Sequence, residues 1–443
     1  MTKLHVIHEW NSYDDARIEV GETTARVGIF LDNLCLTKNE DIWSKTVRDH
    51  MHVSLYPLAL WFASSWWRLH YEVLPAGAKK APSHDWRMNH EMAAANMGFI
   101  WPKIMFSADS QNIQVWAQAS QGNKEESVRF LNGLDHAHFI PKEQFTEVIS
   151  SLISNVLARL YEVGCRDSDL AAIWGFILED LKNPAEHRKR RLEAELGFDP
   201  EGCPDDLITQ AISLEEELGE SSFSELAGAY AEIDGSRLQA MQTLIQADGL
   251  EGKPEDILHL PIQDTGLEPW EIAVSAAREL RRRLGATHGA LDNATLHGLL
   301  GLREASLKDW GPKERSKASV AGPQNDRMMK FIPRKTHPVT QRFELARFIG
   351  DYAHTAKTKP RSWLVSADLA TARQKFQRAF AAEFLCPINS LVEFLDGDFS
   401  ETALEDASNN FSVSEKAIES LLMNNGYFPR YVGDSGMPYR LAS

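Results

Sequence analysis

The sequence has few cysteines, fewer basic than acidic residues and no long hydrophobic run. Its four cysteines, Cys35, Cys165, Cys203 and Cys386, lie far apart and form no CxxC pair. Such spacing is typical of the reducing cytosol, where buried free thiols are the ordinary state. The 47 lysines and arginines stand against 63 acidic residues, so the formal net charge is −16. Nucleic acids and anionic membrane surfaces attract clustered basic residues, so this charge disfavours both as partners.

Signals for export, membrane insertion and the common cofactors are missing as well. No basic segment followed by an apolar one opens the chain, and no apolar run approaches the length of a membrane span. There is no P-loop, no dinucleotide-binding glycine fingerprint, no nucleophile elbow and no kinase signature. We therefore expect a soluble, cytoplasmic protein without a bound cofactor.

The length and composition predict several domains. A chain of 443 residues with 43% hydrophobic residues is long enough for roughly two to four globular domains. Residues 1–130 are rich in aromatic side chains, and their patterns predict both helices and strands. We expect helices at 54–69 and 84–96 and strands at 27–36, 99–107 and 113–119. This segment is predicted to be an α+β module.

Residues 140–305 are predicted to be a helical region. Apolar residues recur at helical spacing in the segments 145–163, 167–181, 187–196, 269–284 and 292–302. The third of these contains the run HRKRR, which we interpret as a solvated helix face. Residues 306–338 lack apolar periodicity and contain several glycines and prolines, so they are predicted to be an exposed linker. The whole chain is expected to be α+β and predominantly helical.

Three segments near the C-terminus carry a recognisable order of motifs. Residues 342–352 read RFELARFIGDY, residues 373–387 read RQKFQRAFAAEFLCP, and residues 406–427 read DASNNFSVSEKAIESLLMNNGY. This order resembles the ImmA/IrrE family of metallo-endopeptidase domains, in which the same places read roughly RFTLAHELGH, EANxFAAELLMP and FxVSxxA. The resemblance covers residues 339–432 and implies a zincin-like domain. Because such proteins typically act beside repressors, it also implies a bacterial role in regulation, stress response, mobile elements or phage defence.

The zinc chemistry of that family is missing from the motif positions. A zincin helix needs two histidines one turn apart and a glutamate that activates the zinc-bound water. Arg347, Phe348 and Asp351 stand at the positions of the first histidine, the glutamate and the second histidine. The neighbourhood of the third ligand contains Gln374, and Glu383 matches a later family glutamate that is not a ligand. We therefore predict a pseudo-peptidase domain that holds no zinc.

The charged residues at and around these positions allow three interpretations. The helices expected at 341–354 and 370–385 can pack through Phe343, Phe376 and Phe380. Their charged side chains would then form ion pairs, since buried charges must be paired. The charged residues concerned are Glu344, Arg347, Asp351, Arg373, Arg378 and Glu383. The second interpretation is a pocket that binds an anionic or peptide ligand through Arg347, Arg373 and Arg378. The third is an unorthodox hydrolase site built from Asp351, His354 and Glu383.

The aromatic N-terminal module offers a further candidate site. Its tryptophans, Trp61, Trp66, Trp67 and Trp86 among them, lie close in the sequence to charged side chains. Tryptophan usually builds cores, but tryptophan and arginine also dominate binding hot spots. Since a small module has little room for so many indoles, we predict a recognition surface that includes Arg68, Trp86, Arg87 and His90. A second possible hydrolase site consists of Glu72, Arg87 and His90.

The segments 401–409 and 413–425 have the pattern of a helix-turn-helix. DNA-binding versions carry basic and amide side chains on the second helix. Here that helix reads SEKAIESLLMNN, with two glutamates and one lysine, so we interpret it as a packing element. The function expected overall is that of a non-catalytic regulatory or interaction protein with a protein partner. A hydrolase with an unorthodox site and a DNA-binding regulator are the alternatives.

Overall fold

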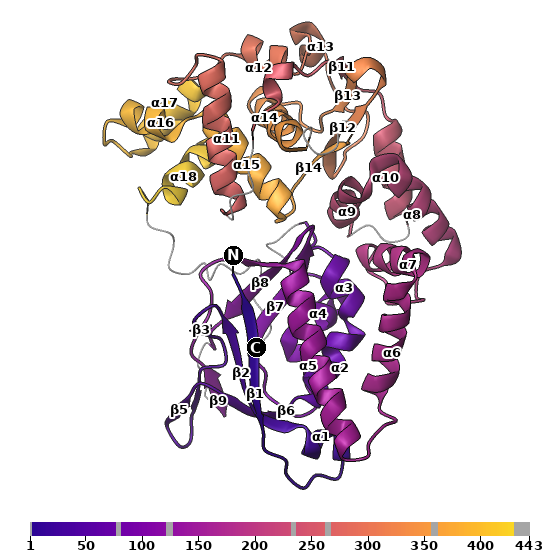
Figure 1. Ribbon diagram of the computed structural model, residues 1–443. Helices are drawn as coiled ribbons and strands as arrows, with labels where there is room; N and C mark the ends of the chain where they lie inside the picture. Colours follow the sequence, from indigo (N-terminus) through magenta and orange to yellow (C-terminus); the bar gives the residue numbers. More distant parts are fainter. Residues whose placement is uncertain are drawn as a thin grey trace. The chain divides into compact units, whose positions relative to one another are not determined.

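A computed structural model describes residues 2–76, 81–120, 127–231, 236–261, 267–355 and 362–428. The fold is mixed α+β, as the sequence predicts (Figure 1). The described residues up to Thr209 form one compact unit, and those from Gln210 onward form a second. We call them the N-terminal and C-terminal units. Residues 429–432 of the domain predicted at 339–432 lie outside the described residues.

The strands of the N-terminal unit form three small antiparallel sheets. In the first, β2 pairs with β1, β3 and β6; in the second, β8 pairs with β7 and β10; in the third, β4 pairs with β5 and β9. The strands are β1 (Leu4–Trp10), β2 (Thr24–Leu31), β3 (Leu34–Cys35), β4 (Asn39–Asp41), β5 (Thr46–Arg48), β6 (Met51–Ser54), β7 (Lys103–Asp109), β8 (Asn112–Gln118), β9 (Val128–Phe130) and β10 (His138–Pro141). The strand pair predicted at 99–107 and 113–119 is confirmed as the β7–β8 hairpin.

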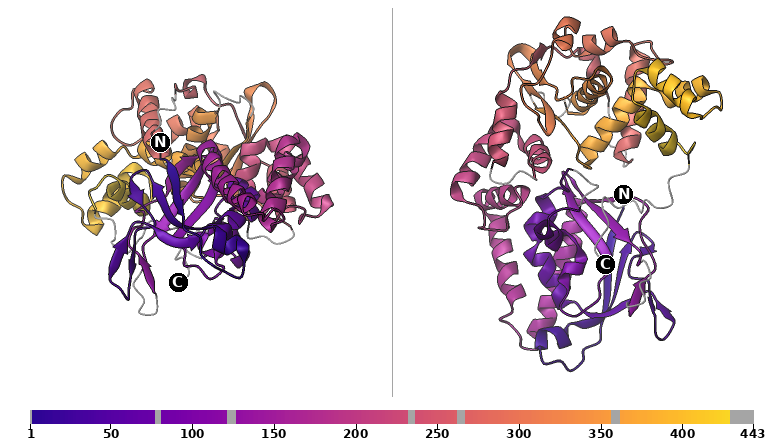
Figure 2. Two further views of the ribbon diagram at one scale, coloured as in Figure 1. Left: turned by 60° about the horizontal axis from the view of Figure 1, so that its bottom comes forward. Right: turned by 180° about the vertical axis from the view of Figure 1, so that it is seen from behind.

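The helices of the N-terminal unit lie together on one side of its strands (Figures 1 and 2). They are α1 (Ile18–Glu22), α2 (Tyr56–Ser64), α3 (Trp66–Tyr71), α4 (His84–His90), α5 (Lys142–Glu162), α6 (Asp169–Lys182) and α7 (Pro184–Glu195), with a 3₁₀ turn at Met92–Ala95. The helix predicted at 54–69 is two helices that meet at Ser65. The helix predicted at 84–96 ends at His90 and is followed by the 3₁₀ turn.

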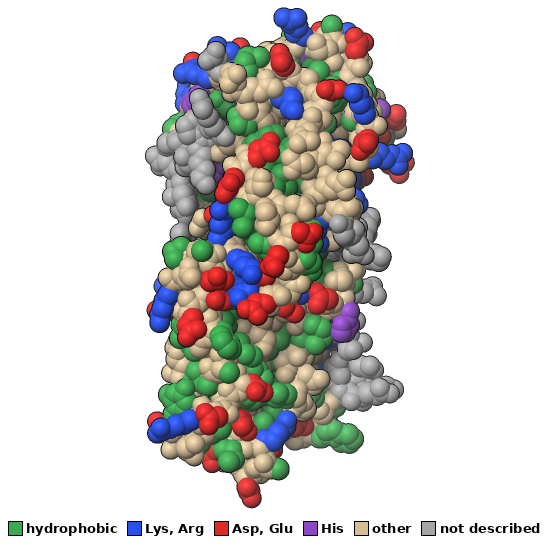
Figure 3. Space-filling model, turned by 90° about the vertical axis from the view of Figure 1, so that its right-hand side faces the viewer, with side chains coloured by type: hydrophobic (Ala, Val, Ile, Leu, Met, Phe, Trp, Pro, Cys, Tyr) green, Lys and Arg blue, Asp and Glu red, His purple; other side chains and the backbone are tan. Residues whose placement is uncertain are grey.

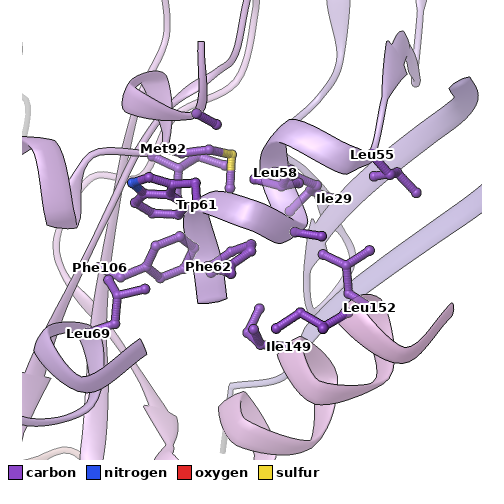
Figure 4. Packing of buried hydrophobic residues seen from close by; sticks show 14 of the residues in the cluster. Ile29, Leu55, Leu58, Trp61, Phe62, Leu69, Met92, Phe106, Ile149 and Leu152 are labelled. Atoms are coloured by element: carbon purple, nitrogen blue, oxygen red, sulfur yellow. The ribbon is translucent and has the colours of Figure 1, made fainter. Parts of the chain in front are cut away.

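The core of the N-terminal unit is an aromatic cluster between the helices and the β7–β8 hairpin. The ring of Phe62 on α2 lies 5.9 Å from that of Phe106 on β7 and 6.3 Å from that of Phe145 on α5. Figure 4 shows Trp61 and Phe62 beside Phe106, with Ile149 approaching from α5. Burial of these large side chains from water is the main force that holds helices and strands together.

The tryptophans named for the predicted recognition surface are buried, which corrects the prediction that the module has too little room for all of them. Trp61, Trp66, Trp67, Trp86 and Trp101 are all buried. The prediction assumed that a small module cannot enclose so many indoles. The unit is larger than the predicted module, because α5, α6 and α7 add buried apolar residues to the same cluster. A core of this size accommodates Trp61, Trp66, Trp67 and Trp101, and Trp86 is buried in a stack on His90.

The basic run on α7 is also not a solvated face. Arg190 and Arg191 are buried. Arg190 donates to Asp180 at 2.9 Å, to Glu193 at 2.9 Å and to Glu201 at 3.0 Å. Packing of α7 against α3 and α6 turns part of this charged helix inward, and the carboxylates around Arg190 compensate its charge.

The C-terminal unit contains one four-stranded antiparallel sheet. Its order is β11-β13-β12-β14, so β14 lies at one edge and pairs with β12. The strands are β11 (Leu250–Gly252), β12 (Ala318–Pro323), β13 (Met329–Ile332) and β14 (Leu364–Ala367). The helices around it are α9 (Glu220–Ala229), α10 (Arg237–Gln246), α11 (Pro269–Arg283), α12 (Asn293–Leu299), α13 (Glu304–Lys308), α14 (Pro338–Thr355), α15 (Ala372–Leu385), α16 (Ile388–Leu395), α17 (Glu401–Phe411) and α18 (Glu415–Asn424). Helix α8 (Asp205–Leu218) spans the boundary of the units.

The predicted linker at 306–338 is wrong, since two strands of this sheet lie within it. Five consecutive residues of β12, Ala318–Gly322, are buried, and so is Phe331 on β13. A strand that is buried on both faces shows no alternation of polar and apolar residues. In β12 the absence of periodicity therefore came from burial rather than from exposure.

Helices α14 and α15 confirm the two helices predicted at 341–354 and 370–385. Phe376 and Phe380 are buried as expected, whereas Phe343 is only partly buried. The helices approach closely at Gly350, where a β-carbon would lie 2.8 Å from the ring of Phe380. No helix in the described part of the chain is both long and apolar enough to cross a bilayer.

We expect Gly350→Ala to lower the free energy of unfolding by about 1–3 kcal/mol, because the added methyl group overpacks the helix contact. Phe380→Ala should cost about 3–5 kcal/mol through the cavity that it leaves. In the Phe380→Ala background the cost of Gly350→Ala should disappear, since the clash partner is gone. Urea unfolding measures all three. Gly298→Ala is the matched control, because nothing lies within 4 Å of its added β-carbon; a loss there equal to that of Gly350→Ala would contradict the packing argument.

His70 on α3 should make the N-terminal unit sensitive to acid. Burial lowers the pKa of His70 to about 3, against about 6.5 in an unfolded chain. Below about pH 6.5 the unfolded state takes up a proton that the folded state refuses, so stability falls by up to about 1.4 kcal/mol per pH unit. His70→Gln should flatten this slope between about pH 6.5 and 4 in urea unfolding. A slope in His70→Gln equal to that of the wild type would refute the assignment of the acid sensitivity to His70.

Candidate functional site

The motif positions of α14 face the edge strand β14. Arg347 and Asp351, one helical turn apart, are both buried. Phe348 between them is fully buried, and its ring centre lies 5.7 Å from that of Phe331 on β13. A phenyl ring in that place cannot take a proton from water. The helix therefore presents an arginine and an aspartate to the strand, with an apolar side chain where a base would be required.

Side chains of α14 and α15 form hydrogen bonds with the backbone N–H and carbonyl groups of β14. The Val365 N–H donates to Asp351 Oδ2 at 3.1 Å, and the Ala367 N–H donates to Gln374 Oε1 at 2.8 Å. The Ala367 carbonyl accepts from Arg347 Nη2 at 2.8 Å. The Val365 carbonyl accepts from Gln374 Nε2 at 2.9 Å and from Gln377 Nε2 at 2.8 Å. An extended peptide that binds an edge strand needs these same groups, and at Val365 and Ala367 they are already taken.

An ion pair joins the two helices beside this strand. Arg373 on α15 donates to both carboxylate oxygens of Asp351, at 2.8 and 2.7 Å, and to the Trp363 carbonyl at 2.9 Å. Burial alone would lower the pKa of Arg373, but the Asp351 carboxylate outweighs it, so that pKa is raised. Such a bidentate pair is among the stronger charge-assisted interactions. The predicted ion-pair network is thus present at this contact.

The buried charge of Arg347 is stabilised by neutral hydrogen-bond acceptors instead of by a carboxylate. Its Nη2 donates to the Ala367 carbonyl and to Gln374 Oε1, which are neutral acceptors. Its Nε is buried without a hydrogen-bond partner. Burial, together with the neighbouring cations Arg378 and Arg334, lowers the pKa of Arg347 to about 9. The backbone of β14 thus stabilises Arg347 where a carboxylate would be expected.

The remaining charged residues on these helices also have partners of their own. Glu344 pairs with Arg334 at 3.3 Å, and Glu383 pairs with Arg278 at 2.7 Å. Arg378 donates to the Leu369 carbonyl at 2.8 Å. The predicted network therefore exists in part, with partners from outside the expected set. For the proposed anion pocket, the structure already gives Arg347, Arg373 and Arg378 acceptors within the fold, and anion binding stays a prediction.

Sequence reasoning missed Glu225, a buried member of this site. Glu225 on α9 accepts from Thr371 Oγ1 at 2.7 Å and from Gln374 Nε2 at 2.9 Å. Burial raises its pKa. Gln374 therefore connects Glu225 on one side with Arg347 on the other. No sequence motif around Glu225 predicts its place in this site, because Glu225 lies far from α14 and α15 in the chain.

The residues proposed as an unorthodox hydrolase site do not come together. Asp351 is held by Arg373, whereas Glu383 is held by Arg278 and accepts from the Ile388 N–H at 3.2 Å. His354 is exposed on α14. Within the described residues, no group of three or more histidine, cysteine, aspartate or glutamate side chains is placed to hold a metal ion. That the domain holds no zinc stays a prediction, and elemental analysis of the purified protein tests it.

Arg68, Glu72 and His90 form a buried cluster in the N-terminal unit. Glu72 Oε2 accepts from Arg68 Nε at 2.6 Å and lies 3.0 Å from His90 Nε2. Arg68 also donates to Asp85 at 2.7 Å. Burial alone would raise the pKa of Glu72, but His90 and Arg68 outweigh it and lower that pKa. Arg87 pairs instead with Glu91 at 2.7 Å.

This cluster is part of the core and not an exposed recognition surface. His90 Nδ1 lies 2.8 Å from the Phe106 carbonyl oxygen, so both ring nitrogens of His90 face acceptors within the fold. The ring of Trp86 stacks on His90 with centroids 3.9 Å apart. Trp86, His90 and Arg68 are all buried. No ring nitrogen is left for a substrate, which also argues against the second hydrolase site.

The C-terminal helices α17 and α18 pack through apolar residues. Leu404, Phe411 and Ile418 are buried in the core of the C-terminal unit. Outward positions of α18 include Glu415, and the helix carries a single lysine. Its charge is unlike that of a helix that contacts DNA phosphates.

Comparison with known proteins finds no matching protein-family model, no matching curated protein and no matching solved structure. The resemblance to ImmA/IrrE domains therefore stays a prediction from the sequence.

Replacing Asp351 by Asn should cost about 3–5 kcal/mol of unfolding free energy, because Arg373 is then buried without a counter-charge. The double variant Asp351→Asn, Arg373→Gln should be less destabilised than that single variant. Denaturant unfolding tests both. The control is Glu304→Gln, which breaks the exposed pair of Glu304 and Lys308 and should cost about 0–1 kcal/mol. Equal losses for Asp351→Asn and Glu304→Gln would show that the Asp351–Arg373 pair is not sealed from water.

Proposed function

We propose that this chain is a non-catalytic, peptidase-derived interaction or regulatory protein of a bacterial stress, mobile-element or defence system. The observation that carries the proposal is the occupied edge of β14. Peptide hydrolysis by a zincin requires a metal-bound water, a base and a strand edge that holds the substrate. Arg347, Phe348 and Asp351 supply neither a ligand set for a metal-bound water nor a base. The backbone groups of Val365 and Ala367, which a substrate strand would need, already form hydrogen bonds with side chains of α14 and α15.

The chemistry of the donor set argues against a zinc ion at this place. A guanidinium at position 347 repels a cation, and the Asp351 carboxylate is neutralised by Arg373. Gln374, in the neighbourhood of the expected third ligand, uses its side-chain oxygen for Arg347 and for the Ala367 N–H. A metal would have to break all of these contacts before it gained a ligand. What the domain keeps is therefore its fold without the zinc chemistry, which favours a role in binding.

A protein is the partner that the charge favours. The net charge of −16 and the acidic character of α18 disfavour phosphate contacts. DNA binding through α17 and α18 remains the alternative, and a titration with duplex DNA over a range of salt concentrations separates the two. A steep loss of affinity with salt is the signature of phosphate contacts; its presence in this chain would favour the DNA-binding alternative.

The test of the proposal is a cleavage assay on the full chain. The purified protein, loaded with zinc and then desalted, should retain less than one zinc per chain and leave a proteome-derived peptide library intact. The folded double variant Asp351→Asn, Arg373→Gln serves as the control for trace contaminants. Cleavage by the wild type that this double variant loses would overturn the proposal. Cleavage by both at the same rate would identify a contaminant.

A further inference from the structure

Helix α9 packs against the edge strand β14 (Figure 1), and it turns polar side chains inward. Ser222 and Glu225, one helical turn apart, are both buried. Ser222 Oγ donates to the Trp363 carbonyl at 2.8 Å. Glu225 accepts from Thr371 Oγ1 at 2.7 Å and from Gln374 Nε2 at 2.9 Å. The helix therefore closes the α14–α15 site with hydrogen bonds as well as with apolar contacts.

The Glu225 carboxylate lies at the start of α15. Thr371, which donates to it, is the N-cap of that helix. Backbone N–H groups and the helix dipole favour a negative charge at such a place. Burial tends to lower the pKa of Arg373 and of Arg378, and the charge of Glu225 opposes this in both. The first turns of α15 therefore form an anion site, and Glu225 fills it.

Arg378 has no carboxylate partner of its own. It is half-buried, donates to the Leu369 carbonyl at 2.8 Å and forms no salt bridge with another described residue. The nearby Asp368 is held by Arg334. Carboxylates are plentiful in this chain, with 63 acidic against 47 basic residues, and Figure 3 shows them spread over the face that it displays. An arginine left with a carbonyl in such a chain favours an acidic ligand from another molecule.

The fold does not need a carboxylate at position 225. Burial raises the pKa of Glu225, so its charged form is costly there. Replacing a buried charge with an apolar side chain is often neutral or stabilising. The single residue that joins α8 to α9 is Gly219, whose φ of +78° favours glycine. A costly contact beside a one-residue joint fits a helix that can leave the site.

We propose that α9 is an autoinhibitory helix: its Glu225 carboxylate occupies an anion site at the start of α15, and an acidic segment of a partner protein takes that site when α9 leaves. Arg373 and Arg378 then face the carboxylates of the partner. The net charge of −16 opposes the encounter at long range, so recognition is local to these arginines. The inference rests on the binding role proposed above and adds the chemistry of the partner and its regulation.

Fluorescence anisotropy of a labelled hexaglutamate peptide with the full chain tests the competition. Glu225→Gln should bind the peptide at least about tenfold more tightly than the wild type, because the internal competitor is weakened. Adding Arg378→Gln should reverse that gain. Glu220→Gln is the matched control, since it removes an exposed carboxylate from the same helix and should leave the affinity unchanged. Equal affinities of Glu225→Gln and the wild type, or no binding by either, overturn the inference.

Hydrogen exchange of the wild type gives a test that needs no variant. Saturating hexaglutamate should speed the exchange of the α9 amides and leave the α11 amides unchanged, because only α9 leaves its place. Unchanged or slower exchange in α9 would show that the peptide does not displace the helix, and this outcome also overturns the inference. Cleavage of the peptide library would count against the proposed function, whereas failure to bind hexaglutamate counts only against the autoinhibitory role of α9.

Discussion

The satisfaction of the backbone of β14 is the constraint on which the C-terminal unit depends. An edge strand that is covered by helices cannot reach water, and each unpaired N–H or carbonyl would destabilise the fold. Here the covering helices supply the missing partners themselves. Asp351 and Arg347 reach the strand from α14, and Gln374 and Gln377 reach it from α15. The identity of these polar side chains is therefore dictated by the sheet as much as by any ligand.

The same constraint explains why charges are tolerated at this depth. Asp351 accepts from a backbone N–H and from Arg373, while Arg347 donates to a backbone carbonyl and to Gln374. A buried charge is costly unless hydrogen bonds and an opposite charge replace its hydration. Glu225 lies beyond Gln374 and forms no salt bridge with another described residue, and burial raises its pKa. In the N-terminal unit the buried charges are likewise paired, since Glu72 accepts from Arg68 and lies beside His90.

The sequence predicted the elements whose patterns are local and missed those set by distant contacts. Helices α14 and α15 followed from apolar residues at helical spacing, and the β7–β8 hairpin followed from two short strand patterns around a turn. Strand β12 was not predicted, because burial on both faces removes the alternation on which prediction depends. Glu225 could not be placed in the site, since only the tertiary fold brings α9 to Gln374. The burial of Trp86 was misjudged, because the hydrogen bond from its indole N–H to the Val73 carbonyl is set by the tertiary fold.

An ion pair can hold two helices together as a zinc ion does, but it cannot activate a water molecule as a zinc ion does. The resemblance implies that positions 347, 348 and 351 correspond to a zinc-binding helix and that the third ligand came from the neighbourhood of Gln374. A zinc ion would tie α14 to α15 and also activate a water molecule. The guanidinium of Arg373 ties the same two helices together through Asp351, yet it has no open coordination position and cannot polarise a water as a metal does. Under the function proposed above, Phe348 stands in place of the base, and the two helices stay joined without the chemistry of a zinc site.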